Sequence, residues 1–375
     1  MSAPRERALN FLAGQPAEPP VCMQIYLGLF LEDRRREALA AVYREMLGGA
    51  PERTLSFEEV SEAELDAWER AWSVLEHPPA WIPVRGWPKQ SADGTRIMLR
   101  GDRVLVASPG AEPADVIASL KGSTRDVWER PEHFSADALP APPALAEALA
   151  DGWAEHPRRA VKRWGSEWLV HGHMASPFCG LYSLLGFAGM MEAMRADPPL
   201  LEAIAANRLA HARTVLDVYA EAGVECVFVE ETLSSADLIS EADYLRFSLP
   251  AAIELFEHAR ERDLRTVYYY CGAIDNRITH LAQLSADALA FEESKKGFEI
   301  ELAAIRRVVG PERPLLGNID AVRLRDGDAK AIQREVERQF DAGGPMIATS
   351  AGSPLTLDTD PAALDLLVKF TAALG

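Results

Sequence analysis

Short apolar segments alternate with amphipathic segments along the second half of the chain. Apolar runs predict strands at Trp168–His173, Glu225–Val229, Thr266–Tyr270, Ala288–Phe291, Pro314–Leu316 and Met346–Thr349. Apolar residues at helical spacing predict helices between them, at Leu181–Met194, Pro199–Ala222, Glu241–Arg262, Asp275–Leu284, Ile300–Val309 and Lys330–Ala342, with a closing helix at the end. Such alternation is typical of parallel strands joined by helical crossovers.

The first 160 residues show a less regular pattern. It predicts a strand at Val21–Leu27 and helices at Glu32–Met46 and Glu58–Leu75. Short apolar runs separated by Asp-Gly and Arg-Gly-Asp turns predict an antiparallel β-hairpin within Trp81–Pro109. The prolines of Pro113–Pro157 predict loops around short helices. The region at about 76–160 therefore reads as an insertion.

These elements predict an α/β fold with a closed barrel. Seven strand candidates are clear, and an eighth is expected near Thr54–Val60 or within the hairpin region. At this length, eight parallel strands favour a (β/α)8 TIM barrel over an open sheet, with an N-terminal helical and β-hairpin elaboration. We expect one barrel domain over residues 1–375, although two domains also fit the length.

The charge of the chain narrows the choice of partners. There are 39 Lys and Arg residues against 57 Asp and Glu residues, so the formal net charge is −18. Such a surface repels nucleic acid and anionic membranes. No run of about 18 apolar residues and no signal-peptide pattern occurs, which favours a cytoplasmic protein. We expect a small-molecule substrate, and the oligomeric state is left open, a homodimer included.

Polar residues recur where the predicted strands end. They are His171 and His173, Glu230 and Glu231, Cys271, Glu292 and Glu293, and Asn318 and Asp320. In a parallel barrel these ends form one mouth, which is where such folds place their active sites. We expect the four glutamates and Cys271 to be catalytic. The residues expected to bind substrate are His171, His173, Tyr269, Asn318 and Asp320. So many acids in one place favour a metal, a cationic or a polar ligand over a polyanion.

Each of these residues also has a purely structural interpretation. Cys271 could be a small buried hydrophobe, and the two histidines could serve only as hydrogen-bonding groups. Glu292 and Glu293 could be the charge pair that favours a helix N-terminus. Because adjacent residues of a strand face opposite ways, we expect one carboxylate of each Glu-Glu pair to face the mouth. Lys295 reads as a solvated side chain.

Several stretches resemble the uroporphyrinogen decarboxylase superfamily. They are GVECVFVEETLSSADLISEADYLRFSLPAAIEL, YYYCGAIDNRI, the segment from ADALAFEESKKGFEI to GNID, and HGHMASPFCGLYSLLGFAGMMEAMRADPPLLEAI. The likeness runs from about residue 161 to the C-terminus, with a weaker match at PPVCMQIY. It implies a (β/α)8 barrel.

The resemblance implies two chemistries. Porphyrinogen decarboxylases carry an arginine-rich loop after the first strand, where this chain has Met23-Gln24-Ile25-Tyr26. A substrate with eight carboxylates needs such cations, so uroporphyrinogen is disfavoured. The other branch transfers methyl groups between a corrinoid and a thiol such as coenzyme M, with zinc held by a His-x-Cys pair and a later Cys. The Cys position matches Cys271, but Tyr269 stands at the His position and the last strand has no Cys.

The leading hypothesis is therefore a methyltransferase of this superfamily. It moves a methyl group between a corrinoid, with a corrinoid protein as partner, or another donor and a thiol or small acceptor. Zn²⁺ is a candidate cofactor, with Cys271, Glu231 and His173 as its ligands. The alternative is a metal-independent decarboxylase or lyase that uses strand-end carboxylates for acid–base work on a small or aromatic substrate. A binding module on a decayed barrel is a third class.

Overall fold

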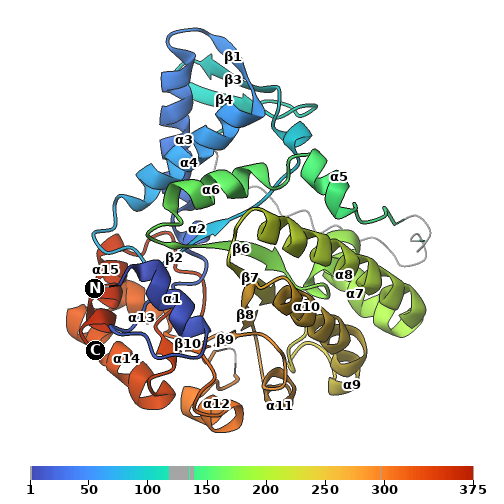
Figure 1. The fold of residues 1–375 in the computed structure, drawn as a ribbon, viewed down its shortest axis with the longest axis vertical. Helices are drawn as coiled ribbons and strands as arrows, with labels where there is room; N and C mark the ends of the chain where they lie inside the picture. The colour runs from blue at the N-terminus through green and yellow to red at the C-terminus, as the bar shows by residue number, and fades with distance from the viewer. Residues whose placement is uncertain (1, 118–134, 136–138, 296, 375) are drawn as a thin grey trace.

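The chain folds as a parallel β-barrel surrounded by helices, with an antiparallel sheet and two helices standing to one side (Figure 1). The computed structural model describes residues 2–117, 135, 139–295 and 297–374. The predicted loops of Pro113–Pro157 therefore lie partly outside the described residues. None of the helices in these ranges is long and apolar enough to cross a membrane.

Seven parallel strands curl around the barrel in the order β11-β10-β9-β8-β7-β6-β2. Their bounds are β2 Trp81–Val84, β6 Leu169–Ala175, β7 Cys226–Glu231, β8 Arg265–Tyr270, β9 Ala288–Phe291, β10 Leu315–Leu316 and β11 Ile347–Ala348. The helices that follow β6 to β11 are α7 Tyr182–Ala196, α8 Pro198–Glu221, α9 Glu241–Asp243, α10 Leu249–Glu261, α11 Ile278–Leu281, α12 Leu302–Val309, α13 Ala321–Asp326, α14 Ala329–Gly343 and α15 Pro361–Ala372. A π-helical turn, Tyr244–Ser248, joins α9 to α10.

The segment around Cys22 takes the eighth position and closes the barrel. On one side it pairs with the last strand, because Met23 N donates to the Thr349 carbonyl (3.0 Å) and Thr349 N donates to the Val21 carbonyl (3.1 Å). On the other side Ala80 N donates to the Cys22 carbonyl (2.9 Å), just before β2 begins. The predicted (β/α)8 barrel is thereby confirmed.

The structure corrects two of the predicted elements. The strand predicted at Val21–Leu27 is shorter, since Tyr26 adopts a left-handed conformation (φ 51°) and helix α2 begins at Leu27 (Leu27–Phe30). The hairpin predicted over Trp81–Pro109 starts too early, because Trp81–Val84 pairs in parallel with β6. The eighth barrel strand was thus hidden within the hairpin region, and the alternative near Thr54–Val60 was wrong.

The antiparallel sheet, together with helices α3 (Glu32–Leu47) and α4 (Phe57–Trp72), forms what we call the N-terminal subdomain. Its strands run in the order β1-β3-β4-β5, at Glu52–Leu55, Thr95–Arg100, Arg103–Ala107 and Ala114–Asp115. A separate apolar core, which includes Tyr43, Phe57 and Ile97, holds the sheet on the two helices. Helix α4 begins at a capping box made by Ser56 and Glu59. The subdomain stands at the top of Figure 1, above the barrel.

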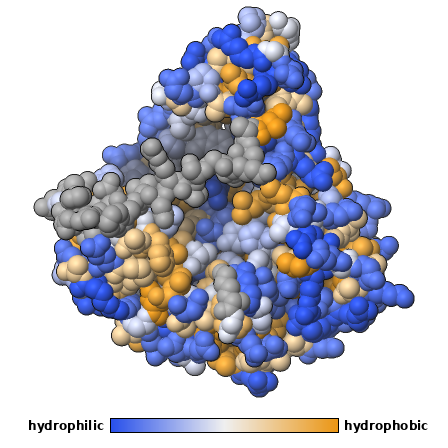
Figure 2. Space-filling view, turned by 180° about the vertical axis from the view of Figure 1, so that it is seen from behind, coloured by the Kyte–Doolittle hydropathy of each residue, from blue (hydrophilic) through white to orange (hydrophobic). Residues whose placement is uncertain are grey.

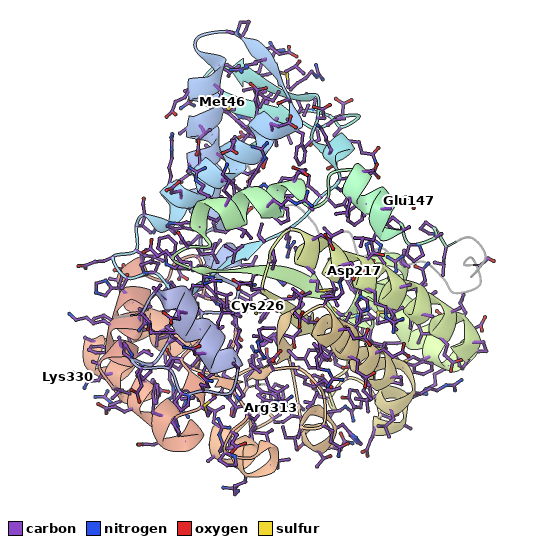
Figure 3. All side chains as sticks on the ribbon, in the orientation of Figure 1. Met46, Glu147, Asp217, Cys226, Arg313 and Lys330 are labelled. Carbon is purple, nitrogen blue, oxygen red and sulfur yellow. The ribbon has the colours of Figure 1, made fainter. Side chains whose placement is uncertain are left out.

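Three further helices lie in the N-terminal half of the chain. They are α1 Pro4–Leu12, α5 Leu145–Ala150 and α6 Glu155–Trp164. Helix α1 contacts β2, β6 and β8. Inside the barrel, the interior core includes Trp81, Cys226, Phe228 and Tyr269, and Cys226 is labelled near the middle of Figure 3.

Candidate active site at the barrel mouth

Strand alternation decides which predicted residues face the barrel interior. On β7, Phe228 belongs to the interior core, whereas Val227 and Val229 pack outward against the helices. Glu230 therefore faces inward and Glu231 outward. The same alternation directs His171 and His173 of β6 inward, with Phe228 contacting both rings at centroid distances of 6.2 and 5.3 Å. The expectation that the Glu-Glu pair splits between two faces is correct for β7.

His173 and Glu230 form a polar pair at the mouth. The Nε2 atom of His173 lies 3.0 Å from Oε2 of Glu230, and its Nδ1 atom lies 3.3 Å from Nη2 of Arg85. Tyr26 also hydrogen-bonds Glu230. Burial alone raises the pKa of Glu230, but the His173 and Tyr26 hydrogen bonds and the Arg85 charge bring that pKa below its ordinary value. Glu230 is thus held as a carboxylate next to the His173 imidazole.

Glu231 is fully buried behind the barrel wall. Its carboxylate accepts hydrogen bonds from Ser176 Oγ and from the Leu233 backbone N–H (2.9 Å). Burial raises the pKa of Glu231 to about 7, although these hydrogen bonds act in the opposite direction. We therefore interpret Glu231 as a group that orders the loop after β7, on the other face of the strand from the mouth.

Cys271 lies at the end of β8 in a second polar network. Burial, followed by the nearby Glu292 carboxylate, raises the pKa of the Cys271 thiol to about 12. Glu292 accepts a hydrogen bond from Gly272 N (2.9 Å) and forms an ion pair with Lys295. The thiol therefore stays protonated near neutral pH, and it is not the free thiolate that a nucleophile requires.

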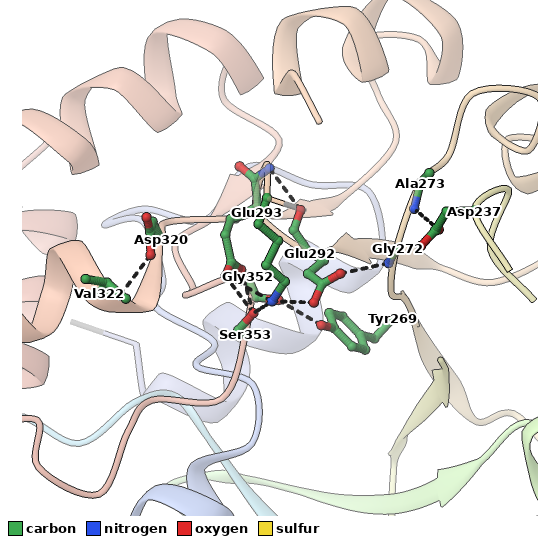
Figure 4. Close-up of polar contacts among 12 residues, drawn as sticks. Asp237, Tyr269, Gly272, Ala273, Glu292, Glu293, Asp320, Val322, Gly352 and Ser353 are labelled. Atoms are coloured by element: carbon green, nitrogen blue, oxygen red, sulfur yellow. Dashed lines mark hydrogen bonds and ion pairs between the residues drawn. The ribbon is translucent and has the colours of Figure 1, made fainter. Parts of the chain in front are cut away.

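Tyr269 and Glu293 are tied to the loop that follows β11. The Tyr269 hydroxyl donates to the Gly352 carbonyl (2.8 Å), and Ser353 Oγ donates to both carboxylate oxygens of Glu293 (2.8 and 2.6 Å). Lys295 also contacts Glu293 (3.2 Å). Figure 4 shows these contacts drawn together between the ends of β8, β9 and β11. Lys295 is half-buried here, where sequence alone favours a solvated side chain.

The other predicted substrate-binding residues have structural partners. His171 is buried and packs on Trp81 with ring centroids 4.1 Å apart, and burial lowers the pKa of its imidazole to about 3. Asn318 is buried and donates to the carbonyls of Glu292 (3.3 Å) and Ile300 (3.1 Å). Asp320 caps α13 by accepting from Val322 N (2.8 Å), apart from the Glu292 network in Figure 4. Of the three, only His171 lines the cavity at the mouth.

The predicted zinc ligands do not come together. Within the described ranges, no three His, Cys, Asp or Glu side chains are placed to hold a metal ion. The Glu231 carboxylate faces Ser176 behind the strand, while His173 is engaged with Glu230 and Arg85. Tyr269, at the position where the resemblance implies a histidine, uses its hydroxyl on a backbone carbonyl. The donor set Cys271, Glu231 and His173 therefore does not fit zinc, and no chemical step is assigned to the metal.

A cavity of about 930 Å³ opens beside the His173–Glu230 pair and extends toward the N-terminal subdomain. Its lining includes the aromatic side chains of Tyr26, Trp68, Trp81, Trp87 and Phe228, so we call it the aromatic cavity, although charged side chains such as Arg35 and Glu64 also line it. Figure 2 shows the surface hollowed between the subdomain, above, and the barrel, below. A concave, mostly apolar space with a few convergent polar groups is the usual form of a small-molecule site.

Sequence reasoning missed Arg85 and Tyr26. Arg85 directly follows β2, so the rule that polar strand ends form the mouth would have found it, had Trp81–Val84 been assigned to the barrel. Tyr26 follows the closing segment in the same way. With Arg85 and Lys295 present, the mouth is less uniformly acidic than the sequence suggested.

A family profile described as uroporphyrinogen decarboxylase (URO-D) matches residues 135–374, well over half of the chain. The chain belongs to the uroporphyrinogen decarboxylase family. Two curated relatives, each described as methylcobamide:CoM methyltransferase MtbA, come from Methanosarcina mazei and Methanosarcina acetivorans. They are 22% and 20% identical over 202 and 197 residues, which is 52% and 51% of this chain and 57% and 55% of the relatives. The chain thus spans about half the length of the curated relatives it matches.

A solved structure described as a methyltransferase from Methanosarcina mazei superimposes with a TM-score of 0.66. The match covers 100% of this chain and 99% of that chain at 16% identity, so it supports the fold of this family member and nothing finer. The resemblance to the superfamily, and to its methyltransferase branch, is confirmed by these comparisons.

Proposed function

We propose that this family member is an enzyme that transfers a methyl group between a corrinoid and a small acceptor at the barrel mouth. The observation that carries the proposal is the His173–Glu230 pair, 3.0 Å apart, beside the aromatic cavity. Both curated relatives are described as methylcobamide:CoM methyltransferases, which supports the same reaction class. The identity of the acceptor and the chemical form of the methyl donor are part of this proposal.

His173 acts as the base in this mechanism. The acceptor's thiol or hydroxyl takes the place of Arg85 at Nδ1 of His173. It gives its proton to that nitrogen as the new bond between its sulfur or oxygen and the methyl carbon forms. The bond from the methyl carbon to the donor breaks, and its electron pair leaves with the donor. Glu230 stays ionised and stabilises the resulting imidazolium, as a carboxylate does for a catalytic histidine. The hydrogen bond from Tyr26 keeps Glu230 in position.

The cavity walls suit a large flat donor. A methylated corrinoid supplies an electrophilic methyl group when bound, and the aromatic and apolar side chains around the cavity can pack against such a ring system. Tyr26 meets Phe228 and Tyr269 edge-on, with ring centroids 5.6 and 5.4 Å apart, which makes a rigid floor beneath the reacting group. A corrinoid protein is the proposed physiological carrier of the donor.

Arg85 favours one alternative function, a metal-independent decarboxylase or lyase. Its guanidinium borders both His173 and the cavity, so it can hold a substrate carboxylate next to an acid–base pair. In that case the His173–Glu230 pair protonates the carbon that loses carbon dioxide. This reaction needs no methyl donor, and that difference separates the two functions experimentally.

The test is an incubation of the full chain with methylcobalamin and a panel of small thiols and phenols. Mass spectrometry of the products and loss of the methylcobalamin absorption report methyl transfer. A methylated product that disappears in His173→Ala and persists in Asp320→Asn supports the proposal. Turnover of carboxylic acids without any methyl donor, and no methylated product, supports the alternative instead.

A further inference from the structure

A second cavity meets the first at the His173–Glu230 pair. It has a volume of about 540 Å³, and Arg85, Trp87, His173 and Glu230 line both cavities. Its far wall is one face of helix α8, which contributes side chains at helical spacing: Arg208, His211, Ala212, Val215, Val218 and Tyr219. The loop after β6, with Ser176 and Gly180, completes it. The reacting pair is thus reached from two separate spaces.

The second cavity is lined by an arginine, Arg208, that has no acidic partner among the described residues. Arg208 donates through Nε and Nη2 to the neutral Asn207 amide oxygen (3.2 and 2.6 Å), and no carboxylate in the described ranges pairs with it. Arg85, at the other end of the cavity, contacts His173, and its charge also acts on Glu230. By contrast, Arg213 of the same helix pairs with Glu254 at 2.8 Å.

Partial burial makes these charges costly without a counterion. Burial lowers the pKa of Arg208, and burial and the Arg208 charge together lower the pKa of His211. The His211 ring lies edge-on to Trp153, with centroids 5.8 Å apart. A planar guanidinium beside an imidazole and an indole is well suited to an anionic group that carries a short apolar body.

We propose that the second cavity is the acceptor site, and that it takes a small acceptor bearing an oxyanion, held by Arg208 at one end with its reactive heteroatom at His173 and Glu230. This inference rests on the proposed methyl transfer, for which it assigns separate spaces to the two reactants. The donor occupies the aromatic cavity, and the acceptor reaches the same pair from the α8 side. Glu230 lies at the other end of the cavity, engaged by His173, so it repels the anion less than a free carboxylate would.

The first experiment measures binding without any methyl donor. Propionate, ethanesulfonate and ethyl phosphate are titrated into the full chain by calorimetry, with propionamide as the uncharged counterpart. We expect at least one anion to bind about tenfold or more tightly than the amide, as a charge-assisted hydrogen bond allows. That preference is expected to vanish in Arg208→Gln, to return in part in Arg208→Lys, and to persist in Arg213→Gln. Which anion binds best identifies the chemical source of the oxyanion.

Equal binding of amide and anions, no binding of any anion, or full anion preference in a folded Arg208→Gln variant would overturn the inference. If Arg208→Gln does not fold, His211→Asn provides the second variant, with the same expected loss. A further outcome is methyl transfer that proceeds at the same rate to neutral and anionic acceptors and is unaffected by substitution of Arg208. That result would contradict the proposed acceptor site but not the proposed function. Anion binding that depends on Arg208, with no methyl transfer to any acceptor, would support the anion site and contradict the proposed function.

Discussion

The hydroxyl of Tyr269 donates a 2.8 Å hydrogen bond to the carbonyl oxygen of Gly352, and so joins the end of β8 to the loop after β11. By resemblance, metal-linked members of the superfamily carry zinc ligands on these two strand ends. In this chain a phenol and a backbone carbonyl connect them directly. This hydrogen bond is shielded from solvent, because Tyr269 is buried in the barrel interior.

Zinc should therefore not co-purify through Cys271. We expect metal content well below one ion per chain, equal in the parent protein and in Cys271→Ala. Among the described residues, Cys271 belongs to no group of three His, Cys, Asp or Glu side chains placed to hold a metal ion, and Glu292 is paired with Lys295. Elemental analysis of both proteins checks this. One zinc per chain that is lost in Cys271→Ala would show that the loop rearranges to build a site. Methyl transfer that survives a chelator is the matching activity result.

Removing the Tyr269 hydroxyl should lower stability. In Tyr269→Phe the buried Gly352 carbonyl loses its donor, at an expected cost of about 1 kcal/mol in the free energy of unfolding. Urea denaturation provides the measurement. Tyr268→Phe is a matched control on the same strand, because the buried Tyr268 hydroxyl has no hydrogen-bond partner within the described residues. Equal effects of the two substitutions would contradict the assignment.

The His173–Glu230 pair should control the rate more than the stability. We expect His173→Ala and Glu230→Gln each to reduce methyl transfer by roughly 10²-fold, the usual contribution of an acid–base group. Asp320→Asn, which alters only a helix cap, should keep the parent rate within about twofold. Initial rates with methylcobalamin and the best acceptor decide the matter. A Glu230→Gln variant at full rate would remove the carboxylate from the mechanism.

Glu231 should make stability depend on pH. The pKa of Glu231 is raised from 4.5 to about 7 in the folded protein. The contribution of this carboxyl group to the free energy of unfolding is therefore complete below pH 4.5 and is lost as the pH rises through about 7. At 1.36 kcal/mol per pKa unit the change is about 3 kcal/mol. Urea unfolding at several pH values should therefore show a smaller decline in Glu231→Gln than in the parent chain.

Glu230 provides a control of opposite sign for that experiment. Its pKa is lowered in the folded protein, so the stability that it contributes is present above pH 4.5 and is lost as the pH falls through the folded value. Comparison of Glu230→Gln with Glu231→Gln separates the two carboxylates, which adjoin in sequence and lie on opposite faces of β7. Identical pH profiles for the two variants would mean that neither carboxylate titrates as assigned.

Sequence patterns were sufficient for the barrel but not for its first two strands. From β6 onward, apolar runs ended close to the observed strand ends because each is buried on both faces. Trp81–Val84 was wrongly assigned to the hairpin because a true antiparallel hairpin, β3–β4, follows it in the sequence. The turn residues of that hairpin outweighed the apolar character of Trp81–Val84. That error concealed Arg85, which a correct strand assignment would have placed at the mouth.

The rule that polar residues at strand ends form the barrel mouth located the candidate site, but it could not assign a role to each side chain. It gave His173 and Glu230, which the structure brings together, alongside Asn318 and Asp320, which serve the backbone. The distinction depends on which face a residue occupies and on partners from distant segments. Ser353, which holds Glu293, and Tyr26, which holds Glu230, are two such partners that no local pattern reveals.

The closure of the barrel has a consequence for how the protein is made. The segment that carries Tyr26 is synthesised long before the residues that hold it in place. Ala351 N donates to Gln24 Oε1 (3.0 Å) across 327 positions, and Ile25 N donates to Ser350 Oγ (3.1 Å). Contacts this distant in sequence form slowly. The phenol that steadies Glu230 can thus reach its place only after β11 has emerged from the ribosome, which makes the reacting pair one of the last features of the molecule to mature.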